Sequence, residues 1–72
     1  MMIDEVVRVT HDSKGFFTID YRTDSRTESI PDHYQNISHG DKGIRIAGVL
    51  IPRDIKGYNL LENHLIEFRG NN

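Results

Sequence analysis

The stretch from residue 6 to residue 22 constrains the fold more than any other part of the chain. Residues 6–10 are mostly β-branched, residues 11–15 have turn-forming chemistry, and residues 16–22 alternate apolar and polar side chains. A period of two is typical of a strand with one buried face. Gly15 supplies the positive φ that a longer hairpin loop needs before pairing resumes. The sequence therefore predicts a β-hairpin whose second arm buries three apolar side chains: Phe17, Ile19 and Tyr21.

Three further segments have weaker signals. Residues 44–51 are almost entirely apolar, which is typical of a strand buried on both faces, and Gly48 then marks a bulge or a close backbone approach. Residues 23–29 are polar and are expected to form a loop or the exposed end of a strand. Asp32 fits as the cap of one helical turn over residues 32–37. The expected strands lie near residues 3–10, 15–22 and 44–51.

The C-terminal segment, residues 58–69, fits two structures. Its large apolar residues are three, four and three apart, which places them on one face of a helix. Asn59 and Glu62 have the spacing of a helix capping box. The alternative is a final hairpin with strands over residues 58–61 and 64–69. We expect the helix, whose apolar face is formed by Tyr58, Leu61, Leu65 and Phe68.

These elements predict one domain over residues 1–72, of the α+β class or alternatively an all-β small barrel, with a mainly antiparallel sheet of three to five strands. In a chain of 72 residues that is 36% hydrophobic, burial barely exceeds the entropy cost of ordering. The chain has no cysteine, so a disulfide is excluded as an aid to stability. The expected core consists of Val7, Val9, Phe17, Ile19, Tyr21, Ile44, Ile46, Val49, Leu61, Leu65 and Phe68.

The charge pattern and the hydropathy exclude several functional classes. Nine Lys and Arg face eleven Asp and Glu, the net charge is −2, and there is no basic run, so the composition does not indicate a general DNA-binding protein. No apolar run approaches the ~18 residues that a membrane span needs. The acidic start of the chain does not fit a secretory signal, and we expect a cytoplasmic protein.

No group of residues has the spacing that catalysis or metal binding needs. His33, His39 and Asp41 are competent metal ligands, but they lie in an expected loop without a fourth ligand, which favours solvated side chains. Residues 11–13, His-Asp-Ser, contain the residue types of a hydrolase triad, yet adjacent side chains point apart and a turn explains them. We expect no metal, no cofactor and no enzymatic activity. The remaining acidic candidates are expected to be solvated rather than paired for acid–base chemistry: Asp20, Asp24, Glu28 and Asp32.

The segment Lys14 to Ile19 resembles the first RNA-binding motif of cold-shock domains, in which Lys-Gly-Phe-Gly-Phe opens a strand of a small barrel. That family keeps its aromatic residues two apart, on one exposed face where they stack on bases. Here Phe16 and Phe17 are adjacent and point to opposite faces, so only Phe16 remains outside the core. The resemblance supports a second hypothesis, a small-barrel nucleic-acid-binding protein that uses the strand over residues 14–22.

The exposed side of the predicted hairpin is the best candidate for a binding surface. Its aromatic residue lies among Arg and Lys side chains, and a lone aromatic ringed by Arg is a common composition for an interface anchor. The alternative is an ordinary solvated sheet face. We expect a non-catalytic interaction module that binds a protein partner or a second copy of itself. The candidate binding residues are Phe16, Arg22, Arg8, Lys14 and Arg26.

Overall fold

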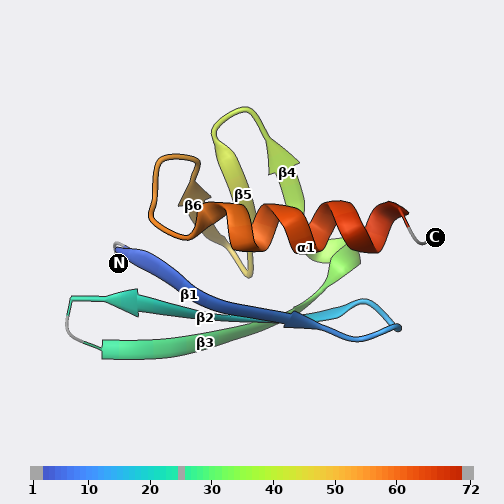
Figure 1. Ribbon diagram of the computed structural model, residues 1–72, viewed down its shortest axis with the longest axis horizontal. Coiled ribbons are helices and arrows are strands. Elements are labelled where there is room, and N and C mark those ends of the chain that lie inside the picture. The colour runs from blue at the N-terminus through green and yellow to red at the C-terminus, as the bar shows by residue number, and fades with distance from the viewer. Residues whose placement is uncertain (1–2, 25, 71–72) are drawn as a thin grey trace.

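The chain folds into two three-stranded antiparallel sheets and one C-terminal helix, as Figure 1 shows. The computed structural model describes residues 3–24 and 26–70. A short 3₁₀-helix, η1 (Tyr34–Asn36), connects the sheets, and α1 (Tyr58–Gly70) ends the chain. The first sheet has the order β1-β2-β3 and the second the order β4-β5-β6. The strands are β1 (Glu5–His11), β2 (Phe16–Thr23), β3 (Arg26–His33), β4 (Ser38–Gly40), β5 (Gly43–Ile46) and β6 (Val49–Pro52).

The predicted α+β class, the N-terminal hairpin and the C-terminal helix are confirmed. The six strands of the described residues form two sheets rather than one. The helix and the second sheet lie on one side of the first sheet, and in Figure 1 no described element lies over the other side. The first sheet therefore has one face turned to the core and one face turned to solvent.

A bulge in β1 changes which valine is buried. Val6 pairs with Tyr21 and Arg8 pairs with Asp20, so Val7 is an extra residue that the partner strand does not match. The extra residue turns Val6 rather than Val7 to the interior. The prediction that Val7 belongs to the core is wrong, because its side chain is 45% exposed.

Residues 26–29 belong to β3, the edge strand of the first sheet. The pairing of β2 with β3 begins at Thr23 and Arg26, and Asp24 has the positive φ of 54° that a tight hairpin turn uses. The stretch is polar because β3 is an edge strand that faces solvent over much of its surface. The expectation of a loop is wrong for these residues, and the alternative of a strand end is confirmed.

The apolar run 44–51 is two strands rather than one. Ala47 and Gly48 have φ values of 50° and 79°, which is the backbone of a two-residue hairpin turn between β5 and β6. The strand predicted over 44–51 and the bulge predicted at Gly48 are therefore wrong. Alanine is not a typical turn residue, so the turn could not be recognised from the sequence. The strands on both sides of the turn contribute to the core, and the whole segment is therefore apolar.

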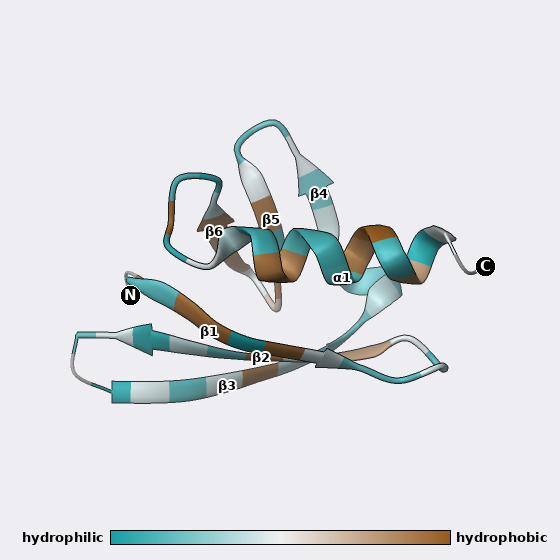
Figure 2. Cartoon of the chain, in the orientation of Figure 1, coloured by the Kyte–Doolittle hydropathy of each residue, from teal (hydrophilic) through white to brown (hydrophobic). Residues whose placement is uncertain are grey.

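The core lies between the first sheet, the second sheet and α1. Figure 2 shows hydrophobic residues along β1, β2 and α1, the elements that border this interior. Val49 and Phe68, which were predicted for the core, pack against it while only partly buried. The predicted members that are buried are Val9, Phe17, Ile19, Tyr21, Ile44, Ile46, Leu61 and Leu65. Tyr58, which was expected on the apolar face of the helix, is buried as well. The other buried members that the expected core did not include are Ile3, Val6, Ile30, Ile37 and Ile51.

Asp32 ties the end of β3 to the turn between β5 and β6. Its Oδ2 accepts a hydrogen bond from the Ala47 backbone N–H at 2.8 Å, and its Oδ1 accepts bonds from the His33 N–H and from Asn36 Nδ2. Burial acts to raise the pKa of Asp32, but these hydrogen bonds outweigh it and hold the pKa below its usual value.

The predicted helical turn exists as η1. Its cap is His33, whose ring accepts from the Gln35 N–H, so the prediction of Asp32 as the cap is wrong.

Candidate interaction surface

The solvent-facing side of the first sheet, which we call the outer face, is built by strand alternation. The side chains of β2 that share this side follow every second residue from Phe16, and their partners on β1 and β3 follow from the register. The outer face consists of Glu5, Arg8 and Thr10 from β1, Phe16, Thr18, Asp20 and Arg22 from β2, and Thr27, Ser29, Pro31 and His33 from β3.

Phe16 is the large apolar side chain of the outer face. It is 54% exposed and lies opposite His33, with ring centroids 4.8 Å apart and ring planes at 79°. The Gln35 N–H donates to His33 Nδ1, so His33 Nε2 carries the proton and donates to the Lys14 carbonyl at 3.1 Å. Both ring nitrogens of His33 therefore make hydrogen bonds, which fix the orientation of this ring beside Phe16.

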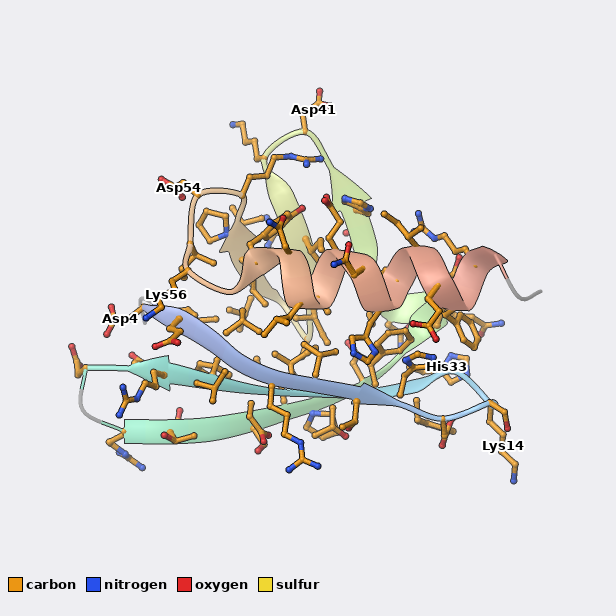
Figure 3. All side chains as sticks on the ribbon, viewed as in Figure 1. Asp4, Lys14, His33, Asp41, Asp54 and Lys56 are labelled. Carbon is orange, nitrogen blue, oxygen red and sulfur yellow. The ribbon has the colours of Figure 1, made fainter. Side chains whose placement is uncertain are left out.

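The turn between β1 and β2 fixes where Phe16 lies. Asp12 Oδ1 accepts the backbone N–H groups of Lys14 and Phe16 at 2.9 and 3.0 Å, and the Asp12 N–H donates to the Phe16 carbonyl. The hydrogen bond from the Phe16 N–H is the main reason that the pKa of Asp12 is lowered. Gly15 has a φ of 96°, and a side chain there would press on His33 and Phe68. Figure 3 shows Lys14 at the tip of this turn, pointing away from the body of the protein.

The structure brings only some of the predicted binding residues together. Arg8, Phe16 and Arg22 share the outer face, and Lys14 lies in the adjoining turn. Arg26 pairs with Thr23, which is buried, so alternation places Arg26 on the opposite side, where it contacts Glu28 at 3.2 Å. The prediction that Arg26 shares this surface is wrong, because the tight turn fixes the register of β3.

Phe16 and Arg22 lie at opposite ends of the outer face. They are six residues apart on one strand, which corresponds to about 20 Å. Arg22 lies opposite Glu5, and Arg8 lies opposite Asp20, whose carboxylate accepts the Ser29 hydroxyl at 2.6 Å. The predicted ring of arginines around Phe16 is therefore wrong. The outer face has an aromatic end and a charged end, and the charged end carries both signs.

The free edge of β3 is poorly suited to adding another strand. The backbone carbonyls of Phe16 and Arg22 point toward β1 and accept hydrogen bonds there. In an antiparallel sheet, the β3 residues opposite Phe16 and Arg22, and every second residue between them, therefore point their N–H and C=O groups away from β2, toward the free edge. Pro31 is one of these residues and has no N–H. The His33 N–H is another, and it donates to Asp32. A partner therefore has the side chains of the outer face to bind, rather than a row of backbone donors.

Other exposed apolar side chains are scattered. Leu60 and Ile66 are on α1, but they are six residues apart and so lie on different sides of the helix. Val7 lies at the bulge of β1 and Leu50 on β6. Among the residues that the structure describes, Phe16 is the exposed aromatic with a packed aromatic neighbour on an uncovered sheet face.

No protein-family model matches the chain, and neither a curated protein nor a solved structure is similar to it. No family match therefore supports the resemblance of residues 14–19 to cold-shock domains. Within residues 3–24 and 26–70, no helix is long and apolar enough to cross a membrane. In the same residues, no three His, Cys, Asp or Glu side chains are grouped so as to hold a metal ion.

A polar cluster, which we call the helix clamp, joins α1 to the second sheet and consists of His39, Arg53, Tyr58 and Glu62. Glu62 Oε2 accepts hydrogen bonds from His39 Nε2 at 3.0 Å, from the Tyr58 hydroxyl at 3.2 Å and from Arg53 Nη1 at 3.2 Å. Arg53 also donates to the carbonyls of Gly40 and Asp41, and its guanidinium lies 5.7 Å from the Tyr58 ring centroid. These mutual contacts satisfy the groups of the cluster, so its chemistry is that of a structural brace.

The helix clamp replaces the predicted capping box. The helix begins at Tyr58, so Asn59 lies inside its first turn, and the Glu62 carboxylate contacts the other clamp residues, His39, Arg53 and Tyr58. Partial burial acts to raise the pKa of Glu62, but hydrogen bonds from His39 and Tyr58 and the charge of Arg53 outweigh it, so the pKa is lowered. Burial raises the pKa of the Tyr58 hydroxyl, and its hydrogen bond to the Glu62 carboxylate raises it further. The prediction of a capping box at Asn59 and Glu62 is wrong.

A pair of histidines that sequence reasoning did not single out links β1 to α1. His11 Nδ1 and His64 Nδ1 are 2.8 Å apart, so one ring donates a hydrogen bond to the other. The His11 ring also stacks on Phe17, with centroids 5.0 Å apart, and meets the edge of Phe68. The two histidines are 53 residues apart in the sequence. No local pattern could have indicated this contact.

Proposed function

We propose that this chain is a non-catalytic interaction module that binds a protein partner through the outer face of its first sheet. The observation that carries the proposal is the position of Phe16. Its ring is more than half exposed, stands on an uncovered sheet face, and packs against an immobilised His33. A large aromatic side chain in rigid surroundings is typical of an interface anchor. The absence of cysteine suits a reducing compartment such as the cytoplasm.

The charges of the outer face favour a protein over a nucleic acid. Arg8 and Arg22 both lie opposite a carboxylate, Asp20 or Glu5. The arginines would attract the phosphate backbone of a nucleic acid, but the carboxylates opposite them would repel it. A protein partner can place an acidic group against each arginine and a basic group against each carboxylate. The second candidate function is single-stranded nucleic-acid binding. It is supported by the exposed ring of Phe16, on which one base could stack, with Lys14 nearby in the turn.

The proposal is tested by affinity capture with matched variants. Tagged protein, its Phe16→Ser variant and its Ile66→Ser variant are used on a lysate of the source organism and on a second, differently tagged copy of the chain. Ile66 is 56% exposed on α1 and so controls for the loss of an exposed apolar side chain. We expect a defined protein to be retained by the wild type and by Ile66→Ser, and lost with Phe16→Ser. Retention by Phe16→Ser, or equal loss with both variants, overturns the proposal.

The nucleic-acid alternative is tested by titration with single-stranded oligonucleotides at two salt concentrations. The proposal predicts no micromolar binding at physiological salt. The alternative predicts micromolar binding that falls with salt, with a log–log slope of roughly −2 to −3 for three or four contributing cations. It further predicts that Arg22→Glu loses most of this binding. That outcome would replace the protein partner by a nucleic acid.

A further inference from the structure

We propose that the partner seated on the outer face is a second copy of this chain, related by a two-fold axis that passes over β2 at the level of Ile19. In this arrangement each Phe16 packs on the second copy's Arg22. The inference rests on the proposed function, because it names the occupant of the same surface. It adds a contact between Phe16 and Arg22 that cannot form within one chain.

The geometry follows from the positions of Phe16 and Arg22 on β2. Both side chains are exposed on the outer face, and both are three residues from Ile19, or about 10 Å to either side of it. They are too far apart to touch within one chain. A two-fold axis that lies in the plane of the interface, perpendicular to the strands, exchanges the two ends of the face. It therefore brings each Phe16 over an Arg22.

An arginine over an aromatic ring is a contact that this chain already uses. The guanidinium of Arg53 lies 5.7 Å from the ring centroid of Tyr58, and that of Arg69 lies 5.5 Å from the ring centroid of Tyr34. A guanidinium above an aromatic face is attracted by the ring and is more easily desolvated than an ammonium. The pairing of Phe16 with Arg22 would extend the same chemistry to an interface.

The charges of the outer face select this axis over the other simple choice. With the axis perpendicular to the strands, Asp20 meets the second copy's Thr18, and Arg8 meets the second copy's Thr10. With the axis parallel to the strands, Asp20 would face Asp20 and Arg22 would face Arg22, and directly opposed like charges repel. At the margin, Glu5 lies level with the second copy's Asp12, but each of these carboxylates already has partners in its own chain. Glu5 contacts Lys56 at 3.8 Å, and Asp12 accepts the N–H groups of Lys14 and Phe16.

The size of the face indicates a weak, concentration-dependent dimer. Three strands of about seven residues cover roughly 14 Å by 23 Å. With the relief of the side chains, two copies would bury on the order of 1,000 Å², which is near the lower limit for a specific interface. Face-to-face sheets pack with their strands nearly aligned, as this axis requires. We expect association in the micromolar range or weaker.

The test is sedimentation equilibrium of the full chain over a series of concentrations, with Phe16→Ala, Arg22→Ala and an equimolar mixture of the two. Each variant alone would have no Phe16–Arg22 contact, and we expect its dimer to be about tenfold weaker or more. A mixed dimer would keep one of the two contacts, because one variant supplies Phe16 and the other supplies Arg22. The mixture should therefore associate more strongly than either variant alone. Ile66→Ala serves as the control and should match the wild type.

The outcomes separate this inference from the proposed function. A wild type that stays monomeric to millimolar concentration, or a mixture that associates no better than its components, overturns the two-fold arrangement. The proposed function then still stands if a different protein is captured in a manner that depends on Phe16. Self-association that none of the variants changes overturns the two-fold arrangement as well, since it would place the interface elsewhere.

Discussion

The ring of Phe16 meets the ring of His33 edge-on, with centroids 4.8 Å apart, across the paired ends of β2 and β3. His33 cannot turn without losing its hydrogen bonds to the Lys14 carbonyl and the Gln35 N–H. An aromatic side chain that is already held in place gives up little freedom when a partner binds. This contact is the physical basis for treating the aromatic end of the outer face as a binding anchor.

The two adjacent phenylalanines should differ sharply in their effect on stability. Phe17 is fully buried and Phe16 is more than half exposed. We expect Phe17→Ala to cost ~3–5 kcal/mol, which is enough to unfold a small domain, because it leaves a cavity in the core. Phe16→Ala should cost less than about 1 kcal/mol. Thermal melts of the two variants measure the difference, and a larger loss for Phe16→Ala would invert the assignment of the two faces.

Gly57 should tolerate a side chain much less well than Gly48. Their φ values are 83° and 79°, so the backbone strain of an alanine is similar, roughly 1–2 kcal/mol. A Cβ at Gly57 would overlap the Val6 carbonyl, whereas a Cβ at Gly48 meets nothing. We therefore expect Gly57→Ala to lose more stability in urea denaturation than Gly48→Ala. Equal losses would mean that residue 57 does not pack against β1.

The helix clamp should make stability depend on pH through Glu62. Its pKa is lowered by folding, so its contribution is present above the ordinary value of 4.5 and is lost as the pH falls through the folded-state pKa. Glu62→Gln should flatten this acid dependence while leaving the part due to Asp12 and Asp32. Glu67→Gln, on the exposed side of α1, is the control and should keep the wild-type profile. Identical slopes for all three proteins below about pH 4.5 would remove Glu62 from the clamp.

Asp32 should be worth more to stability than an ordinary surface carboxylate. It holds the Ala47 N–H at the turn of the second sheet, and hydrogen bonds to a charged group contribute about 1.5–3 kcal/mol. Asp32→Ala should lower the midpoint of urea unfolding accordingly. Asp54→Ala, at an exposed position, should change the free energy of unfolding by less than about 0.5 kcal/mol. A harmless Asp32→Ala would show that the two sheets do not depend on this bond.

The parts of the fold that follow local periodicity could be predicted from the sequence. In β2 the alternation of Phe16 and Phe17 holds because the strand contains no bulge, and Leu61 and Leu65 repeat with the helical period. Val7 was misplaced because the bulge of β1 depends on how that strand pairs with β2. Such irregularities arise from tertiary pairing and leave no mark in the local pattern.

The candidate site was predictable only in part, for the same reason. Phe16, Arg8 and Arg22 follow from strand alternation, but Arg26 does not, because its side of the sheet is fixed by the tight turn before it. The rigid neighbour of Phe16 was not predictable at all. His33 is 17 positions away in the chain, and only the register of β2 with β3 brings the two rings together. The contacts that matter most for the site are the non-local ones.

The most direct test of the account is a dilution series of isotopically labelled protein followed by amide chemical shifts. We predict that shifts change with concentration at outer-face residues of β2, above all Phe16 and Arg22, and at His33. Amides of the exposed side of α1, such as those near Ile66, should stay constant and so serve as the internal reference. Changes that cluster on α1 or on the second sheet, with the outer face unmoved, would contradict the claim that the outer face is the docking surface.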